Sequence, residues 1–198
     1  MNKDQLYHGI VIGASAGGWD ALVKILFGLP ENYALPILVV QHRHMNDFNG
    51  LERSLKRKIP LPVISPCDKQ EIEPGKVYIA PANYHMLVER TGIIALSLDE
   101  KVKWSRPSID VLFESAAHAW GKGVIALLLT GANSDGMEGM ITVKALGGLT
   151  IAQDPTTAEA PVMPRSAIDA GAVRMVLTPA EIAGLLVTLK AGRHPGTE

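Results

Sequence analysis

The sequence predicts a doubly wound α/β domain, in which a mainly parallel sheet lies between two helical layers and an antiparallel hairpin is inserted near residues 84–98. Three observations support this fold class. Short apolar runs alternate with helical patterns along the chain. The runs are continuously apolar, as expected for parallel strands that helices cover on both faces. Two β-type runs, "HMLVE" and "IIALSL", are separated by Thr91-Gly92, which is typical of an antiparallel hairpin.

The remaining elements follow in a regular order. Listed along the chain, they are the run "GIVIGA", a helix near 17–28, the run "LPILVVQH", a helix near 46–58, the runs "PVIS" and "KVYIA", the hairpin, a helix near 109–120, the run "GVIALLLTG", a helix near 136–146, the run "LTIAQD", a short helix at 163–170 and the run "VRMVLT". A last helix is expected over 179–191. Thr178 can cap it, Pro179 suits its first position, and Glu181 completes a capping box.

Composition excludes several classes of partner and of fold. The chain has 198 residues and a formal net charge of -1, from 19 Lys and Arg against 20 Asp and Glu. The sequence contains no basic block, so its charge gives no reason to expect a nucleic acid or an anionic membrane surface as a partner. The single cysteine, Cys67, allows no internal disulfide, fits a reducing compartment, and is expected to be an inert thiol.

The sequence shows no targeting or membrane-spanning segment. Its first residues, "MNKDQLYHGI", lack the apolar core of a signal peptide, and no apolar run approaches the roughly 20 residues that a bilayer requires. We therefore expect a cytoplasmic protein without direct membrane insertion.

Chemically suggestive residues follow three of the predicted strands. Ser15 follows "GIVIGA", His42 ends "LPILVVQH", and Asp135 lies a few residues after "GVIALLLTG". Because ligands of such folds bind at the carboxyl ends of parallel strands, we expect these side chains to meet. A nucleophile, a base and a carboxylate that orients the base are the components of a hydrolytic triad.

The glycine-rich loop "GASAGG" matches a nucleophile turn better than a phosphate-binding loop. A Walker loop needs a lysine after its last glycine, but Gly18 is followed by Trp19. A dinucleotide fingerprint has glycine where Ser15 stands, and an acid where the second strand ends in Gln41-His42. The spacing Gly-x-Ser-x-Gly is instead that of a nucleophile elbow, and the following helix would direct backbone amides at a developing oxyanion.

Each of these residues also has a structural explanation. Ser15 could be the N-cap of the first helix. The segment Asp135-Gly136-Met137-Glu138 has the form of a capping box, although a cap and a catalytic role are compatible. His42-Arg43-His44 could begin a metal site, although no cysteine or carboxylate lies nearby at ligand spacing.

The order Ser, His, Asp along the chain, with five motifs around it, resembles a known family. The motifs are "IGASAGG", "VVQH", "RPSIDVLFESAA", "LLTGANSDGMEGM" and "AQDPTTAEAPVMPRSAIDAGAV". Together they resemble the catalytic domain of CheB, the protein-glutamate methylesterase of bacterial chemotaxis. The resemblance extends from Gly9 to about Leu189.

This resemblance implies a function and roles for the three residues. Ser15 corresponds to the family's nucleophile, His42 to its general base, and Asp135 to the carboxylate that orients the base. The family's substrates are methyl-esterified glutamates on cytoplasmic helices of chemoreceptors, and some members also deamidate receptor glutamines. The implied partner is therefore a methylated chemoreceptor cytoplasmic domain. No metal or organic cofactor is implied.

The resemblance also indicates which residues shape the site. Ala16, Gly17 and Ala132 are the candidates for the oxyanion hole. The family usually has Thr where this chain has Ala16, and Met where it has Ala132, but the main-chain donor of Ala132 is retained. Arg43, His85 and Met163 are candidates to line the substrate cleft, although His85 could instead cap the hairpin. The family commonly has Met-Pro where this chain has Arg43-His44.

Family members typically carry an N-terminal receiver domain that controls the catalytic domain. Here we expect residues 1–198 to form a single catalytic domain without a receiver, which is either a stand-alone esterase, the hypothesis we favour, or a domain excised from a longer chain. Three alternatives stay open: a non-catalytic module that binds a receptor or another signalling protein, a nucleotide-binding domain, and an esterase with a different ester substrate. The receptor, the oligomeric state and the presence of deamidase activity are not given by the sequence.

Overall fold

A computed structural model describes residues 5–42 and 50–192. Seven strands form the central sheet in the order β11-β10-β9-β2-β3-β6-β4, and every neighbouring pair is parallel. Their bounds are β2 Gly9–Ala14, β3 Ile37–Gln41, β4 Val63–Ile64, β6 Val77–Ile79, β9 Val124–Leu128, β10 Leu149–Gln153 and β11 Met175–Leu177. The predicted doubly wound sheet is confirmed.

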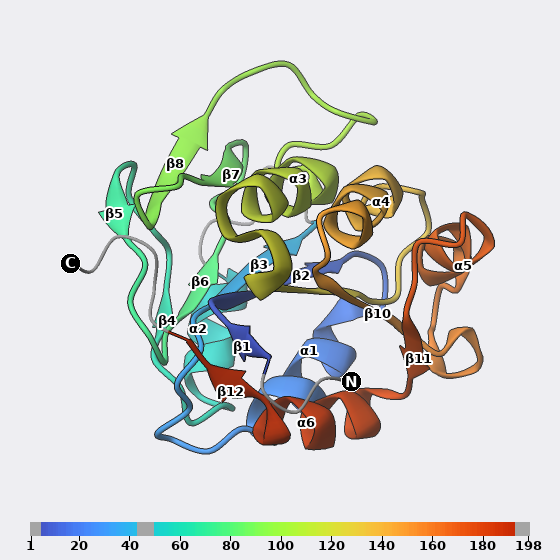
Figure 1. Cartoon of the computed structure of the whole chain (residues 1–198), viewed down its shortest axis with the longest axis horizontal. Coiled ribbons are helices and arrows are strands. Elements are labelled where there is room, and N and C mark those ends of the chain that lie inside the picture. The colour runs from blue at the N-terminus through green and yellow to red at the C-terminus, as the bar shows by residue number, and fades with distance from the viewer. Residues whose placement is uncertain (1–4, 43–49, 193–198) are drawn as a thin grey trace.

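Helices cover both faces of this sheet (Figure 1). One face packs against α1 (Gly18–Phe27), α2 (Gly50–Lys56) and α6 (Pro179–Thr188). The other face packs against α3 (Ile109–Trp120), α4 (Met137–Ala145) and α5 (Val162–Asp169). All residues of β2 and β9 are buried between the two layers, which explains their unbroken apolar sequences.

The predicted hairpin is confirmed and has one strand more than expected. β7 (His85–Val88) and β8 (Ile93–Ser97) pair in antiparallel fashion, and β5 (Gln70–Glu71) adds to the far side of β8. This three-stranded sheet is separate from the central one. It lies beside α3, with which β7 is in contact.

The prediction for the end of the chain is partly wrong. α6 begins as expected, with Thr178 accepting from the Glu181 N–H and the Glu181 carboxylate accepting in return. The helix ends at Thr188 instead of continuing to residue 191. Residues Lys190–Ala191 form β12, which pairs in parallel with β1 (Leu6–Tyr7).

The strand order determines where a ligand can bind. The chain first builds the sheet from β2 outward through β3 and β6, and then returns to the other side of β2 to add β9, β10 and β11. The order therefore reverses between β2 and β9, and the crevice at the carboxyl ends of strands flanking such a point is the usual ligand site of this architecture. Ser15, His42 and Asp135 follow three adjacent strands at this edge.

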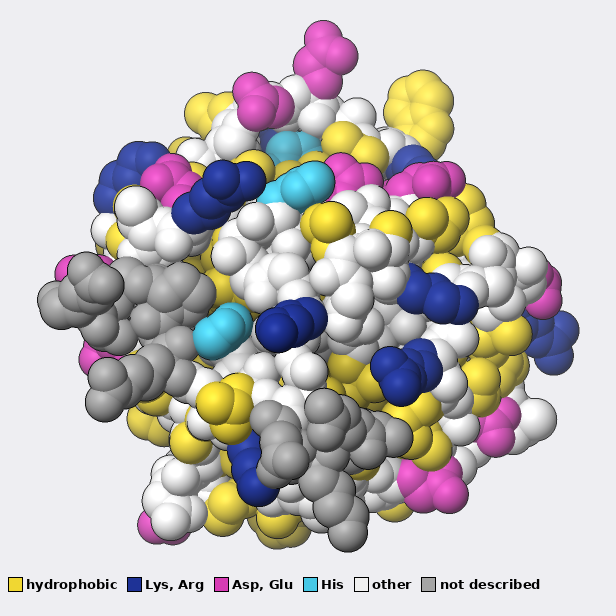
Figure 2. Space-filling model, in the orientation of Figure 1, with side chains coloured by type: hydrophobic (Ala, Val, Ile, Leu, Met, Phe, Trp, Pro, Cys, Tyr) yellow, Lys and Arg dark blue, Asp and Glu magenta, His cyan; other side chains and the backbone are white. Residues whose placement is uncertain are grey.

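The described part of the chain contains no helix long and apolar enough to cross a membrane. On the face of the molecule in Figure 2, acidic and basic side chains are spread among one another over the surface. This distribution agrees with the balanced charge of the sequence.

Candidate active site

The turn after β2 holds Ser15 at the switch point of the sheet. Its backbone N–H donates to the Thr130 carbonyl at 2.9 Å, and its carbonyl accepts from the Gly18 N–H at 2.9 Å. Gly17 has φ 72° and ψ 0°, which are the angles of the third residue of a type II turn and favour glycine there. Because Gly17 occupies the N-cap position of α1, Ser15 is not the helix cap.

His42 lies directly beside this turn. Its backbone N–H donates to the Ala14 carbonyl at 2.9 Å, which fixes the end of β3 against the end of β2. Its ring Nε2 lies 2.8 Å from Asp135 Oδ2, and its side chain is only 12% exposed. Since Asp135 accepts at Nε2, the other ring nitrogen, Nδ1, is the one available to take a proton from a neighbouring hydroxyl.

The Asp135 carboxylate is completely buried and accepts four hydrogen bonds. Oδ2 accepts from His42 and from the Ile109 N–H at 2.8 Å. Oδ1 accepts from Ser108 Oγ at 2.8 Å and from the Asp110 N–H at 3.1 Å. Burial alone would raise the pKa of this carboxyl, but the hydrogen bonds from His42 and from the two backbone amides outweigh it and hold the pKa below its ordinary value.

The capping-box interpretation of Asp135 is wrong in an informative way. The N-cap of α4 is Gly136, with φ 97°, and the Asp135 carboxylate does not bond to α4. It caps the start of α3 instead, through the Ile109 and Asp110 amides. The N-terminus of α4 is capped in return by Asp110, whose Oδ1 accepts from the Gly139 N–H at 2.9 Å. The two helices thus exchange caps.

Lys103 supplies a positive charge to this arrangement. Its Nζ lies 2.8 Å from Asp110 Oδ2 and donates to the Ser134 carbonyl at 3.2 Å. Burial nevertheless raises the pKa of Asp110; hydrogen bonds from Gly139 and Lys103 oppose the rise, and the nearby Asp135 charge adds to it. Two buried carboxylates therefore lie side by side at the edge of the site, and the positive charge of Lys103 partly compensates their negative charge.

Comparison with known proteins identifies the family of this chain. The family model for the CheB methylesterase matches residues 10–186. The chain belongs to the CheB methylesterase family. A protein from Leptospira interrogans is 45% identical over 183 residues, which are 92% of this chain and 95% of that protein. The crystal structure of the Thermotoga maritima CheB methylesterase catalytic domain superposes with a TM-score of 0.88 at 34% identity, and the match covers 92% of this chain and 98% of that one.

Longer relatives carry the same region within a larger chain. Proteins from Nitrosospira multiformis and Pseudomonas aeruginosa, each named protein-glutamate methylesterase/protein-glutamine glutaminase, are 41% and 36% identical to this chain over 184 and 190 residues. The matches cover 93% and 94% of this chain but 52% and 54% of those proteins. The chain thus spans about half the length of these relatives of the CheB methylesterase family, which is a family of hydrolases.

The candidates for the oxyanion hole of this CheB-family chain lie at the surface of the site. Ala16 and Ala132 are exposed, and neither backbone N–H donates to another described residue. Thr130 Oγ1 donates to the Ala16 carbonyl at 2.9 Å and accepts from the Ala160 N–H at 2.9 Å, which links the turn to the segment after β10. Gly17 is pressed against Glu159, since a Cβ at Gly17 would lie 2.5 Å from that residue's Cβ.

Two of the three residues predicted to line the cleft do not do so. His85 is 1% exposed: its Nδ1 accepts from the Ser108 N–H at 3.2 Å and its Nε2 donates to the Glu100 carbonyl at 3.0 Å. Its side chain therefore holds the start of α3 in place through the hydrogen bond from Ser108. Met163 is fully buried, and its thioether packs on Gly131. Arg43, the third candidate, lies outside the described residues, as do His44 and the start expected for the second helix.

Sequence reasoning missed several residues that hold the site together. Ser108 and Asp110 were quoted only as part of the "RPSID" motif, and Lys103, Thr130 and Gln41 received no role. Ser108 stands at the N-cap position of α3, a place where serine is favoured, and that signal was available. Its hydroxyl, however, donates to Asp135 instead of capping its own helix.

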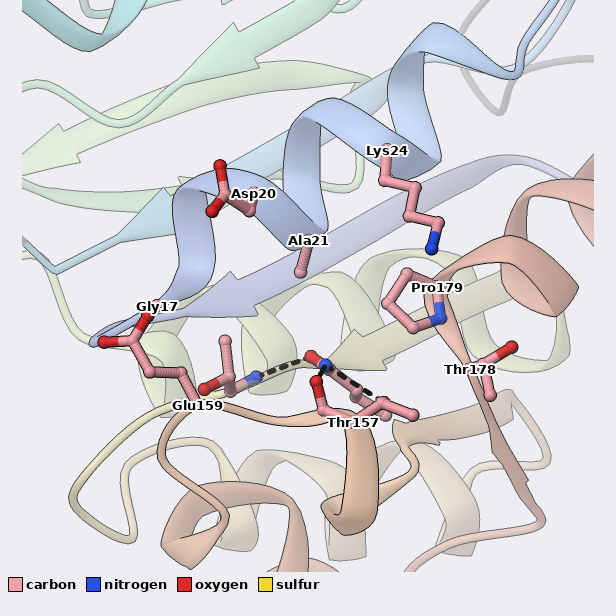
Figure 3. Close-up of a pocket in the computed structure, with 10 residues that line it drawn as sticks. Gly17, Asp20, Ala21, Lys24, Thr157, Glu159, Thr178 and Pro179 are labelled. Atoms are coloured by element: carbon pink, nitrogen blue, oxygen red, sulfur yellow. Dashed lines mark hydrogen bonds between the residues drawn. The ribbon is translucent and has the colours of Figure 1, made fainter.

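A pocket of about 450 Å³ lies against the nucleophile turn, on its α1 side (Figure 3). Asp20 and Lys24 from α1 line one side of it, and Thr157 and Glu159 from the segment after β10 line the other. The carboxamide of Gln153 forms part of the wall, where it accepts from the Thr130 N–H and donates to the Thr157 carbonyl, both at 3.0 Å. No group of three or more potential metal ligands occurs among residues 5–42 and 50–192.

Proposed function

We propose that this chain hydrolyses γ-methyl esters of glutamate on the cytoplasmic helices of a methylated chemoreceptor, with Ser15 as nucleophile, His42 as general base and Asp135 as the residue that orients the base. The observation that carries the proposal is the 2.8 Å contact between His42 and the buried, four-fold hydrogen-bonded Asp135, directly beside the turn that holds Ser15. The names of the relatives support the substrate class.

The geometry supports a two-step mechanism. Ser15 Oγ attacks the ester carbonyl carbon and passes its proton to Nδ1 of His42, while the Asp135 carboxylate stabilises the imidazolium that forms. The exposed N–H groups of Ala16 and Ala132 donate to the oxygen of the tetrahedral intermediate. The intermediate collapses as the bond to the methoxy oxygen breaks, and methanol leaves with the proton from His42.

The acyl-enzyme is then hydrolysed in the reverse sense. His42 takes a proton from water, the resulting hydroxide attacks the acyl carbon, and a second tetrahedral intermediate forms. Its collapse breaks the bond to Ser15 Oγ, which recovers its proton from His42, and the glutamate carboxylate is released. The same attack on a glutamine side chain would release ammonia, so the site is also suited to deamidation.

The test measures methanol released from a methyl-labelled chemoreceptor cytoplasmic domain. Wild type should release methanol, and Ser15→Ala should reduce the rate by as much as ~10⁶-fold if the triad acts as a unit. Release that Ser15→Ala leaves unchanged would remove Ser15 as the nucleophile. No release from several receptors would favour a binding module or a different ester.

A treatment with EDTA separates this mechanism from a metal-dependent one. The proposed steps use only protein groups and water, so we expect the rate to be unchanged. Strong inhibition would instead favour a metal bound through His42 and His44.

A further inference from the structure

Gln41, the last residue of β3, lies behind the nucleophile turn and donates one amide hydrogen to Ser15 in that turn and the other to His42. Nε2 is 2.7 Å from the Ser15 carbonyl oxygen and 3.1 Å from the His42 carbonyl oxygen. One side chain therefore ties the main chain of the nucleophile to the main chain of the base. The orientation of the carboxamide is fixed by these bonds, because its oxygen could not face two carbonyl oxygens.

The bond to Ser15 determines where a neighbouring N–H points. In a trans, planar peptide group the C=O and the N–H point in opposite directions. The Ser15 carbonyl faces inward, where the Gln41 amide and the Gly18 N–H both donate to it. The N–H of the same peptide group belongs to Ala16, so it points outward, where no described residue accepts it.

The oxygen of the Gln41 carboxamide is in a less favourable environment than its nitrogen. Oε1 is buried and has no hydrogen-bond partner among the described residues. It lies against Gly18, where a Cβ would be only 2.3 Å from it. A buried acceptor without a donor costs free energy, and an apolar side chain of the same shape would avoid that cost. Such a locally unfavourable choice is expected where a residue serves function.

We propose that Gln41 is a positioning residue for the oxyanion hole: by holding the Ser15 carbonyl, it fixes the Ala16 N–H in the direction of the developing negative charge. This inference rests on the proposed function, in which Ala16 donates to the tetrahedral intermediate. A donor that is held rigidly stabilises the transition state without reorganising when the charge forms. Gln41 itself touches neither the substrate nor the reacting atoms.

The decisive variant is Gln41→Met, which keeps the size of the side chain and removes its donors. Using methanol release from a helical peptide that carries one γ-methyl glutamate, we expect kcat to fall about 10- to 100-fold, somewhat less than for outright loss of an oxyanion donor. KM should stay within about twofold, because the interaction matters only in the transition state. Urea unfolding should give a midpoint close to that of wild type, because the loss of the two donated hydrogen bonds offsets the removal of the unpaired Oε1. Gln70→Met, which alters a half-buried glutamine in β5 far from the site along the chain, should leave kcat and KM unchanged.

A kcat equal to that of wild type would overturn the proposal, and so would a loss of kcat accompanied by a matching loss of stability.

The Gln41→Glu variant decides the question even if Gln41→Met fails to fold. Its carboxylate cannot donate, but the protonated carboxyl can, so the ratio of its kcat to that of wild type should rise as the pH falls from 8 to 5. A flat ratio would count against Gln41. Absence of release by wild type would overturn the proposed function and this inference together, whereas an active wild type with an unaffected Gln41→Met overturns this inference alone.

Discussion

Asp135 and Asp110 occupy similar positions, but their pKa values are shifted in opposite directions from the ordinary value. Each is buried, and each accepts at least one backbone N–H at the N-terminus of a helix to which it does not belong. Asp135 has four donors, one of them His42, and its pKa is lowered. Asp110 has one backbone donor and Lys103, lies beside a second carboxylate, and its pKa is raised.

The difference shows that a helix N-terminus does not by itself decide the charge state of a buried carboxylate. Both residues benefit from the positive end of a helix dipole, and both lose hydration on burial. Burial raises the pKa of both; at Asp135 the hydrogen bonds to the ionised form outweigh it, whereas at Asp110 fewer hydrogen bonds oppose it and the neighbouring Asp135 charge adds to it. At this edge of the sheet, Asp135 is therefore equipped to stay charged beside His42, whereas Asp110 mainly joins α3 to α4.

The substitution expected to separate the two aspartates most strongly is Asp135→Asn. The variant keeps the size of the side chain but removes the charge that stabilises protonated His42, so we expect kcat to fall by about 10³–10⁴-fold. Methanol release measures the effect. Asp110→Asn serves as the matched control and should stay within a few-fold of wild type. Equal losses in the two variants would show that the assignment of separate roles is wrong.

The sequence was sufficient to predict the fold class and the position of three polar side chains at one edge of the sheet, for a physical reason. The apolar runs indicate buried parallel strands. The residues that follow parallel strands lie at the same edge of the sheet, and this does not depend on the conformation of the loops. Ser15, His42 and Asp135 could therefore be expected at one edge of the sheet before any contact was known.

The partners of these side chains could not be predicted, because local pattern and tertiary packing disagree. Asp135-Gly136-Met137-Glu138 looks like the start of its own helix, yet the carboxylate is taken by α3, which lies 25 to 27 residues earlier in the chain. Histidine is a residue type often found in binding clefts, but His85 is buried and accepts a hydrogen bond from Ser108 at the start of α3. The end of α6 was misplaced because β12 pairs with β1, from the opposite end of the chain.

The next largest effect is expected for Lys103→Met, which leaves the Asp110 carboxylate buried without its cation. Because the lysine side chain is 32% exposed, we expect a loss of unfolding free energy of about 1–3 kcal/mol at neutral pH, less than for a fully buried pair. Urea unfolding measures it. The double variant Lys103→Met/Asp110→Asn should recover most of the loss. A double variant as unstable as Lys103→Met alone would show that Lys103 acts through something other than Asp110.

A smaller effect separates the two aspartates in acid. Because the folded-state pKa of Asp135 lies below its unfolded value of about 4, its ionisation stabilises the fold above that pH, and the contribution is lost as the pH falls through the folded pKa. Wild type should therefore lose unfolding free energy more steeply below about pH 4 than Asp135→Asn does. Urea unfolding between pH 2 and 5 compares the slopes, and parallel curves would contradict the lowered pKa.

The smallest expected effect is that of Asp110→Asn on stability, and its sign is opposite. Because the folded-state pKa of Asp110 is raised, the folded protein binds a proton more tightly than the unfolded chain, so wild type loses stability as the pH rises from about 4 through the folded pKa. The neutral amide can still accept the Gly139 N–H and avoids this loss. At pH 7 the variant should be as stable as wild type or more stable by up to about 1 kcal/mol, with the advantage shrinking toward pH 4. A variant that is less stable at pH 7, with a deficit that closes in acid, would mean that Lys103 stabilises the Asp110 charge by more than its burial costs.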